Sequence, residues 1–206
     1  MNIAQTLADR AKRYSGKPAL IFQDQALSFQ KLQENVLRVA SVLQRCGVKK
    51  SDKIAIFLPN CPEYVYSYLA CFVLGTVCVP LDYMLKMDEL SSCLGHAEIK
   101  ALIAQENTDI SLKNLKKEVP SLEIMIVCGR KIPETLFFDD CLSQPADDLP
   151  AVPIFDHDPA LVMYTSGTTG QPKGILLNYK HLEGSPGPWN ILWIYPTVMS
   201  NCALCL

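Results

Sequence analysis

A run of small residues near the end of the chain has the composition of a phosphate-binding loop. An apolar stretch, residues 160–164, leads into Thr165, Ser166, Gly167, Thr168, Thr169 and Gly170, and Lys173 follows three residues later. Glycines allow backbone N–H groups to converge on an anion, and hydroxyl groups add further donors. The lysine adds positive charge. These residue types at this spacing predict a site for a phosphorylated ligand.

Two other interpretations of this run are weaker. It differs from a Walker A loop, because the residue five positions after Gly167 is Pro172, where that loop has its second glycine. A polar hairpin between two strands is the simpler alternative, since another strand-like stretch, residues 175–177, follows the run. A plain turn rarely has this length and this lysine, so we favour the phosphate site.

The rest of the chain alternates between helix-like and strand-like segments. Apolar residues at helical spacing predict helices over residues 3–14, 32–45, 61–74, 87–96 and 111–118. Short apolar runs predict strands at residues 18–22, 53–58, 77–79, 101–103, 124–127, 160–164 and 175–177. Such alternation is typical of an α/β fold in which helical crossovers join the parallel strands of a sheet. Five prolines between residues 133 and 159 predict an irregular surface connection.

The composition is that of an ordinary globular chain. The 206 residues are 49% hydrophobic and 19% charged, with a net charge of -2, which excludes intrinsic disorder and a broad nucleic-acid-binding surface. Residues 64–81 carry no charge, but Gly75 and Pro80 divide them into a helix and a strand, so we expect no transmembrane segment. The 9 cysteines and the absence of a signal peptide predict reduced thiols in a cytoplasmic protein. Cys202 and Cys205 lack the further partners that a zinc site needs.

The segment from Tyr164 to Gly174 resembles the signature loop of the AMP-forming adenylating enzymes, which include acyl-CoA synthetases, luciferases and the adenylation domains of peptide synthetases. Three earlier segments resemble further landmarks of this superfamily in the same order: residues 27–56, 58–63 and 75–82. The resemblance covers residues 1 to about 183 and is strongest to fatty-acyl or related acyl-CoA ligases.

The resemblance implies two half-reactions. A carboxylate attacks the α-phosphate of Mg-ATP and gives an acyl-adenylate and pyrophosphate, and coenzyme A then takes the acyl group. The β- and γ-phosphates and the leaving pyrophosphate would be held by Thr165, Ser166, Gly167, Thr168, Thr169, Gly170 and Lys173. Mg²⁺ would be shared with the phosphates and would touch the Thr165 hydroxyl. The resemblance assigns no catalytic side chain in this chain.

The remaining polar residues are more simply explained as structural. His96, His157 and His181 are scattered and fit no catalytic triad or metal-binding spacing. We expect residues 156–158 to form a turn, and the tyrosines at positions 64, 66 and 68 to pack in the core and at interfaces.

Two parts of the chain differ in character. Residues 1–183 resemble the N-terminal portion of the AMP-binding domain, whereas residues 184–206 form a divergent apolar tail without Asp, Glu, Lys, Arg or His. Codons can be chosen for the tail so that a shifted reading frame encodes a charged, amphipathic sequence. We therefore expect a frameshift near Pro186. Sequencing the coding DNA and the transcript from the codon for Lys180 past the stop codon would test this. No counterpart is found of the family's adenine- and ribose-binding segments or its mobile C-terminal lid domain.

The sequence therefore predicts an N-terminal fragment of an ATP-dependent acyl-CoA ligase, itself with little or no activity. Its parent enzyme would act on a small-molecule carboxylic acid, ATP and coenzyme A, without nucleic acid; the oligomeric state stays open. One alternative is a non-catalytic nucleotide-binding or interaction module, such as a truncated isoform. Another is a different adenylating enzyme, such as an aryl-CoA ligase or a peptide-synthetase adenylation domain, since fold-level kinship does not name a substrate.

Overall fold

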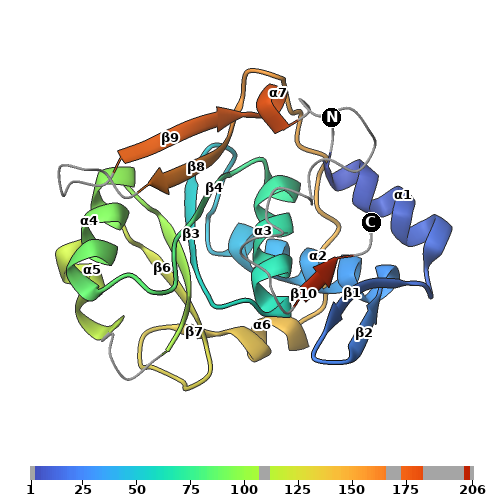
Figure 1. Cartoon of the computed structure of the whole chain (residues 1–206), viewed down its shortest axis with the longest axis horizontal. Coiled ribbons are helices and arrows are strands. Elements are labelled where there is room, and N and C mark those ends of the chain that lie inside the picture. The colour runs from blue at the N-terminus through green and yellow to red at the C-terminus, as the bar shows by residue number, and fades with distance from the viewer. Residues whose placement is uncertain (1–2, 107–111, 166–172, 183–201, 205–206) are drawn as a thin grey trace.

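A seven-stranded sheet forms the centre of the computed structural model, which describes residues 3–106, 112–165, 173–182 and 202–204 (Figure 1). The spatial order of this sheet is β7-β6-β5-β3-β4-β8-β9. Its strands are β3 (Lys53–Phe57), β4 (Val77–Pro80), β5 (Ala101–Gln105), β6 (Ile124–Cys128), β7 (Leu136–Phe137), β8 (Pro159–Thr165) and β9 (Lys173–Asn178). Five of the six neighbouring pairs are parallel, and β8 with β9 is antiparallel. The predicted α/β class with a mostly parallel sheet is confirmed.

Helices cover both faces of this sheet. The helices are α1 (Ile3–Tyr14), α2 (Phe29–Arg45), α3 (Pro62–Leu74), α4 (Met87–Ala97), a 3-10 turn η1 (Leu112–Asn114), α5 (Leu115–Glu118), α6 (Phe138–Ser143) and α7 (Tyr179–Leu182). Helices α4 and α5 lie on one side of the strands in Figure 1, and α1, α2 and α3 on the other. A smaller antiparallel sheet, in the order β10-β1-β2, combines β1 (Pro18–Phe22), β2 (Gln25–Ser28) and β10 (Cys202–Leu204).

The two-residue period of the central strands explains how one sheet serves two cores. Ile54 and Ile56 of β3 belong to the core that includes α2 and α3. Ala55 and Phe57, the alternate residues, belong to the core that includes α4 and α5. Because successive side chains of a strand point to opposite faces, a continuous apolar run fills both layers at once. All four of these residues are fully buried.

The structure corrects the sequence-based elements in three places. The stretch at residues 175–177 joins the sheet antiparallel to its neighbour, and β1 and β2 are also antiparallel, so not every strand is reached by a crossover. The connection over residues 133–159 contains β7 and α6, whose Phe138 is fully buried, and is not wholly irregular. The predicted helix at 111–118 is a short turn and a four-residue helix in its described part.

Other expectations can be compared with the described residues. No helix among them is both long enough and apolar enough to cross a membrane. Seven cysteines are free thiols: Cys46, Cys61, Cys71, Cys78, Cys93, Cys128 and Cys141. The predicted break at Gly75 is confirmed, because this residue closes α3 in the left-handed conformation with φ of 65°. Apart from β10, the tail after residue 183 lies outside the described residues.

Replacing Gly75 by alanine should destabilise the fold. A Cβ at this position would lie 2.9 Å from Ile154 Cδ1 and 2.9 Å from Val152 Cγ1, and its backbone angle disfavours any residue with a Cβ. We expect Gly75→Ala to lower the free energy of unfolding by about 1–2 kcal/mol, measured by chemical denaturation. Gly95→Ala is the matched control, because its Cβ would meet no atom within 4 Å in the last turn of α4; this change should be neutral or stabilising. Equal losses in both variants would contradict the prediction.

Candidate functional site

The predicted phosphate loop connects two strands at the carboxyl edge of the parallel sheet. Strands β3, β4 and β8 run parallel, so their carboxyl ends lie at one edge. Strand β8 ends at Thr165, β9 begins at Lys173, and these two residues are partners across the antiparallel pair. The segment between them therefore connects the two strands of a β-hairpin. Lys173, the first residue of β9, is exposed. Ser166, Gly167, Thr168, Thr169 and Gly170 lie outside the described residues.

The hairpin and the phosphate loop are therefore compatible descriptions of one segment. Sequence reasoning treated a polar hairpin as the alternative to a ligand site, but the structure shows that β8 and β9 form the hairpin with Thr165 opposite Lys173 at the carboxyl end of β8. In open α/β sheets ligands bind outside the carboxyl ends of the strands. The geometry brings Thr165 and Lys173 together. Phosphate binding by the segment between them stays a prediction.

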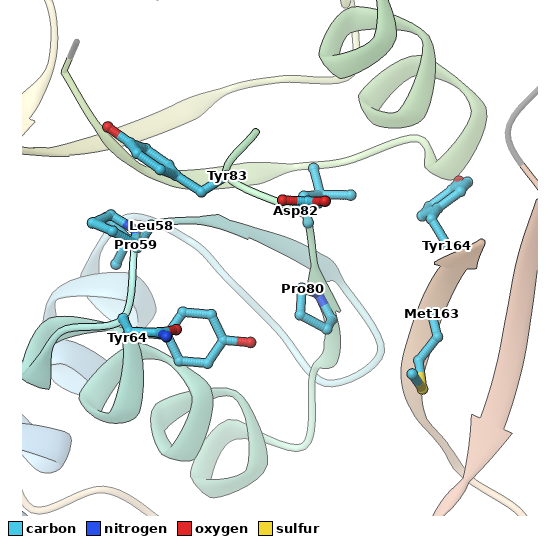
Figure 2. Close-up of a pocket in the computed structure, with 10 residues that line it drawn as sticks. Leu58, Pro59, Tyr64, Pro80, Asp82, Tyr83, Met163 and Tyr164 are labelled. Atoms are coloured by element: carbon cyan, nitrogen blue, oxygen red, sulfur yellow. The ribbon is translucent and has the colours of Figure 1, made fainter. Parts of the chain in front are cut away.

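A pocket of about 430 Å³ lies next to the end of β8 (Figure 2). Figure 2 shows Met163 and Tyr164 on one side of it, with Pro80 and Tyr64 across from them. Apolar and aromatic side chains dominate the lining, and Asp82 is its charged residue. The lining comprises Leu58, Pro59, Asn60, Tyr64, Pro80, Leu81, Asp82, Tyr83, Met163 and Tyr164. The size and the mixed lining suit a small organic ligand or part of one.

The pocket lies beside the carboxyl ends of β4 and β8, which share a single ladder pair in the described residues. In β4 and just beyond it, the N–H groups of Val77 and Leu81 donate to the β3 side, to Asp52 O (2.8 Å) and Ile56 O (2.9 Å). Alternate residues of a parallel strand face the same neighbour, so positions 78 and 80 face β8. Cys78 pairs with Leu161, the one pair that the described residues of the two strands form. Pro80 has no N–H with which to continue the ladder, so the hydrogen-bonded pairing of the two strands ends there.

Tyr164, the last residue before Thr165, contacts helix α4 as well as the pocket. Its hydroxyl lies 2.7 Å from His96 Nδ1 and 3.3 Å from the carbonyl oxygen of Cys93. Burial, with a smaller contribution from Cys93, raises the pKa of Tyr164 to about 12. The hydroxyl therefore keeps its proton at neutral pH and acts as a hydrogen-bonding group, not as a base.

Three histidines were expected to be structural, and two fit that expectation directly. His157 stacks on Phe155 with ring centroids 5.8 Å apart, and His181 Nδ1 accepts the backbone N–H of Asn178 at 3.0 Å. His96 differs, because its partner Tyr164 lines the pocket. Sequence reasoning missed this pair, since 68 residues separate its members and neither position carries a local signal of the contact.

The tyrosines of α3 agree with the expected packing role. Tyr64 and Tyr68 are buried, and their rings stack with centroids 6.1 Å apart. Tyr64 also reaches the pocket from the first turn of α3. The expected turn at residues 156–158 is present, and Asp158 within it anchors the start of β8.

Asp158 joins the long connection before β8 to the body of the fold. Its Oδ2 lies 2.7 Å from Lys50 Nζ and accepts the backbone N–H of Phe155 at 2.8 Å. Lys50 Nζ also donates to the carbonyl oxygen of Pro153 at 2.8 Å. The hydrogen bond from Lys50, followed by that from Phe155, holds the pKa of the Asp158 carboxyl below its ordinary value of 3.8. The ion pair is partly shielded, with side-chain exposures of 31% and 15%.

The fold defines an α/β protein with a β8–β9 hairpin at the carboxyl edge of a mostly parallel sheet. The chain belongs to the family of AMP-binding enzymes, which its sequence matches over residues 7–185.

Its relatives include proteins named as CoA ligases. The chain is 27% identical over 193 residues to the crotonobetaine/carnitine–CoA ligase of Proteus mirabilis (strain HI4320), covering 88% of this chain and 37% of the relative. It is 28% identical over 202 residues to the long-chain-fatty-acid–CoA ligase of Bacillus subtilis (strain 168), covering 85% of this chain and 36% of the relative. The chain thus spans little more than a third of the length of these relatives.

Solved structures show the same fold. The anthranilate CoA ligase AuaEII in complex with anthranoyl-AMP superposes with a TM-score of 0.79 at 26% identity, over 87% of this chain and 35% of that one. The coronafacic acid ligase from Pectobacterium brasiliense gives a TM-score of 0.75 at 27% identity, over 89% of this chain and 36% of that one. A structure of the N-terminal domain of FACL13 from Mycobacterium tuberculosis, at 24% identity and a TM-score of 0.73, shares the fold over 88% of this chain.

Loss of the Asp158 carboxylate should remove a pH-dependent part of the stability. Because the folded pKa is depressed, the contribution is present above the ordinary value of 3.8 and disappears as the pH falls through the lower folded value. We expect Asp158→Asn to cost about 1 kcal/mol at pH 7, and the difference from the wild type to shrink below about pH 4, measured by urea denaturation. Asp140→Asn is the control, because its pair with Lys131 is 60–65% exposed and should contribute little. A pH-independent difference would contradict the prediction.

Proposed function

We propose that this chain supplies the phosphate-binding part of an ATP-dependent, AMP-forming acyl-CoA ligase. The observation that carries the proposal is the pairing of Thr165 with Lys173 at the carboxyl edge of the sheet. Family membership over residues 7–185 supports it, as does the fold shared with a CoA ligase in complex with an acyl-AMP. The proposed ligands of the β- and γ-phosphates are Thr165, Ser166, Gly167, Thr168, Thr169, Gly170 and Lys173.

The proposed chemistry is the first half-reaction of such a ligase. A substrate carboxylate attacks the α-phosphate of ATP, the bond between the α-phosphorus and the bridging oxygen breaks, and pyrophosphate leaves with the electron pair. Negative charge grows on the leaving group, where Lys173 and the donors of the loop would stabilise it. Mg²⁺ when bound would neutralise part of the phosphate charge, and the Thr165 hydroxyl is the ligand that we propose from this chain. Coenzyme A would be the acyl acceptor in the second half-reaction.

We further propose that the 206-residue chain binds the phosphates without completing the ligase reaction. The residues that we assign in this chain all serve the phosphates, and none is assigned to the adenine, the ribose or the acyl group. Among the described residues, no group of three or more His, Cys, Asp or Glu side chains is placed to hold a metal ion by itself. Shared coordination with phosphate oxygens suits Mg²⁺, which commonly takes one or two protein ligands and keeps several waters.

Replacing Lys173 tests this proposal. We expect Lys173→Ala to weaken the binding of pyrophosphate and of Mg-ATP by about tenfold or more, because a charge-assisted contact is lost, measured by isothermal titration calorimetry. Lys180→Ala is the matched control, because it removes the same charge from the exposed surface of α7, seven residues along the chain. Its affinity should stay near that of the wild type.

Two outcomes would contradict the proposal. Equal affinities in the two lysine variants would mean that the hairpin base is not the phosphate site. Carboxylate-dependent ATP–pyrophosphate exchange by the purified chain would show that it completes the first half-reaction on its own. Binding without exchange is the expected result, and it would also describe a non-catalytic nucleotide-binding module.

A further inference from the structure

The hydroxyl of Tyr164 links the carboxyl end of β8 to helix α4. It lies 2.7 Å from His96 Nδ1 in the last turn of α4 and 3.3 Å from the carbonyl oxygen of Cys93 one turn earlier. The Tyr164 and His96 rings also meet edge to face, with centroids 5.8 Å apart and an interplanar angle of 78°. A single side chain of β8 thus makes two polar contacts and one aromatic contact with the helix.

Helix α4 is a firm support for this link. Leu90 and Leu94 on its inner face are fully buried, and Cys93 is 4% exposed. These residues belong to the core that also contains Phe57 of β3 and Leu102 of β5. The helix therefore moves with the centre of the sheet, whereas the ring of His96 is exposed on its outer side.

Strand β8 has fewer ladder pairs to the body of the sheet than the central parallel strands have. Strands β3 and β5 share four successive pairs, and β5 and β6 share five. Strand β8 pairs with β4 at Leu161, and Pro80 offers no N–H beyond that point. Its remaining pairs are with β9, which is an edge strand of the sheet. In the described residues no ladder pair joins the carboxyl end of β8 to β4, so side-chain contacts there contribute to where Thr165 lies.

We propose that Tyr164 and His96 form a positioning pair that fixes the carboxyl end of β8, and with it the Thr165–Lys173 end of the hairpin, for phosphate binding. The ligand in this inference, a phosphate, rests on the proposed function. The positioning itself rests on the contacts described above. Tyr164 acts through the strand, since the residue that follows it is the first of the proposed phosphate ligands.

The protons can satisfy both contacts at once. The Tyr164 hydroxyl donates to the Cys93 carbonyl, and its oxygen accepts from His96 when Nδ1 carries a proton. The raised pKa of Tyr164 keeps the hydroxyl protonated. Removing the hydroxyl or the ring nitrogen therefore breaks the link, whereas an amide placed near Nδ1 can still donate.

Amide hydrogen exchange of the ligand-free 206-residue chain tests the geometry. We expect Tyr164→Phe and His96→Leu to raise exchange by about three- to tenfold at residues 162–165 and 173–176, and not in β3 or β5. His96→Asn, whose side-chain amide lies where Nδ1 was, should stay near the wild type. Tyr14→Phe is the matched control, because it removes the same hydroxyl from α1, where the ring packs against Phe29. Unchanged exchange in Tyr164→Phe, or an equal rise throughout the chain, would overturn the inference.

Pyrophosphate binding by the same variants tests the functional consequence. We expect Tyr164→Phe and His96→Leu to weaken pyrophosphate affinity by about three- to tenfold. The double variant should lose no more affinity than either single variant, because all three changes break the same Tyr164–His96 contact. Normal affinity in Tyr164→Phe, with the wild type binding, would overturn the positioning role and leave the proposed function intact. A wild type that binds no pyrophosphate would overturn the proposed function, and the exchange experiment would then decide the link by itself.

Discussion

The missing N–H of Pro80 is the constraint that shapes how the strand leading to the candidate site is held. Position 80 faces β8, and a donor there would let the parallel ladder continue beyond the Cys78–Leu161 pair. Proline ends that ladder, and its ring lines the pocket of about 430 Å³ at the same edge of the sheet. The same residue thus borders the space for a ligand and leaves the end of β8 to be held by other contacts.

Strand β8, with one ladder pair to β4, has other attachments at both ends. At its start, Asp158 and Lys50 hold the incoming connection through an ion pair of 2.7 Å. At its end, Tyr164 reaches α4 on the opposite side of the pocket from Tyr64. Each attachment is a modest interaction of about 1 kcal/mol. Together they position a hairpin that the central sheet itself holds by one backbone pair, which suits a segment that must present donors to a phosphate at a defined place.

The sequence predicts the elements of this fold better than their pairing. Gly75 and Pro80 mark boundaries because their backbone chemistry is local, and the apolar runs of β3, β5 and β6 identify buried strands. The direction of β9 could not be predicted, since an apolar run such as residues 175–177 reads alike in parallel and antiparallel strands. Helix α6 was missed because six residues between prolines carry too little periodicity. The His96–Tyr164 contact depends on tertiary packing that no local pattern encodes.

The most direct test of the central claim is an NMR titration of the isotope-labelled chain with pyrophosphate in the presence of Mg²⁺. The account predicts that the amide shifts that change will be concentrated in residues 165–173, with smaller changes at the neighbouring ends of β8 and β9. Saturable changes confined to another surface, or none at millimolar pyrophosphate, would contradict the claim that this hairpin binds the phosphates of ATP.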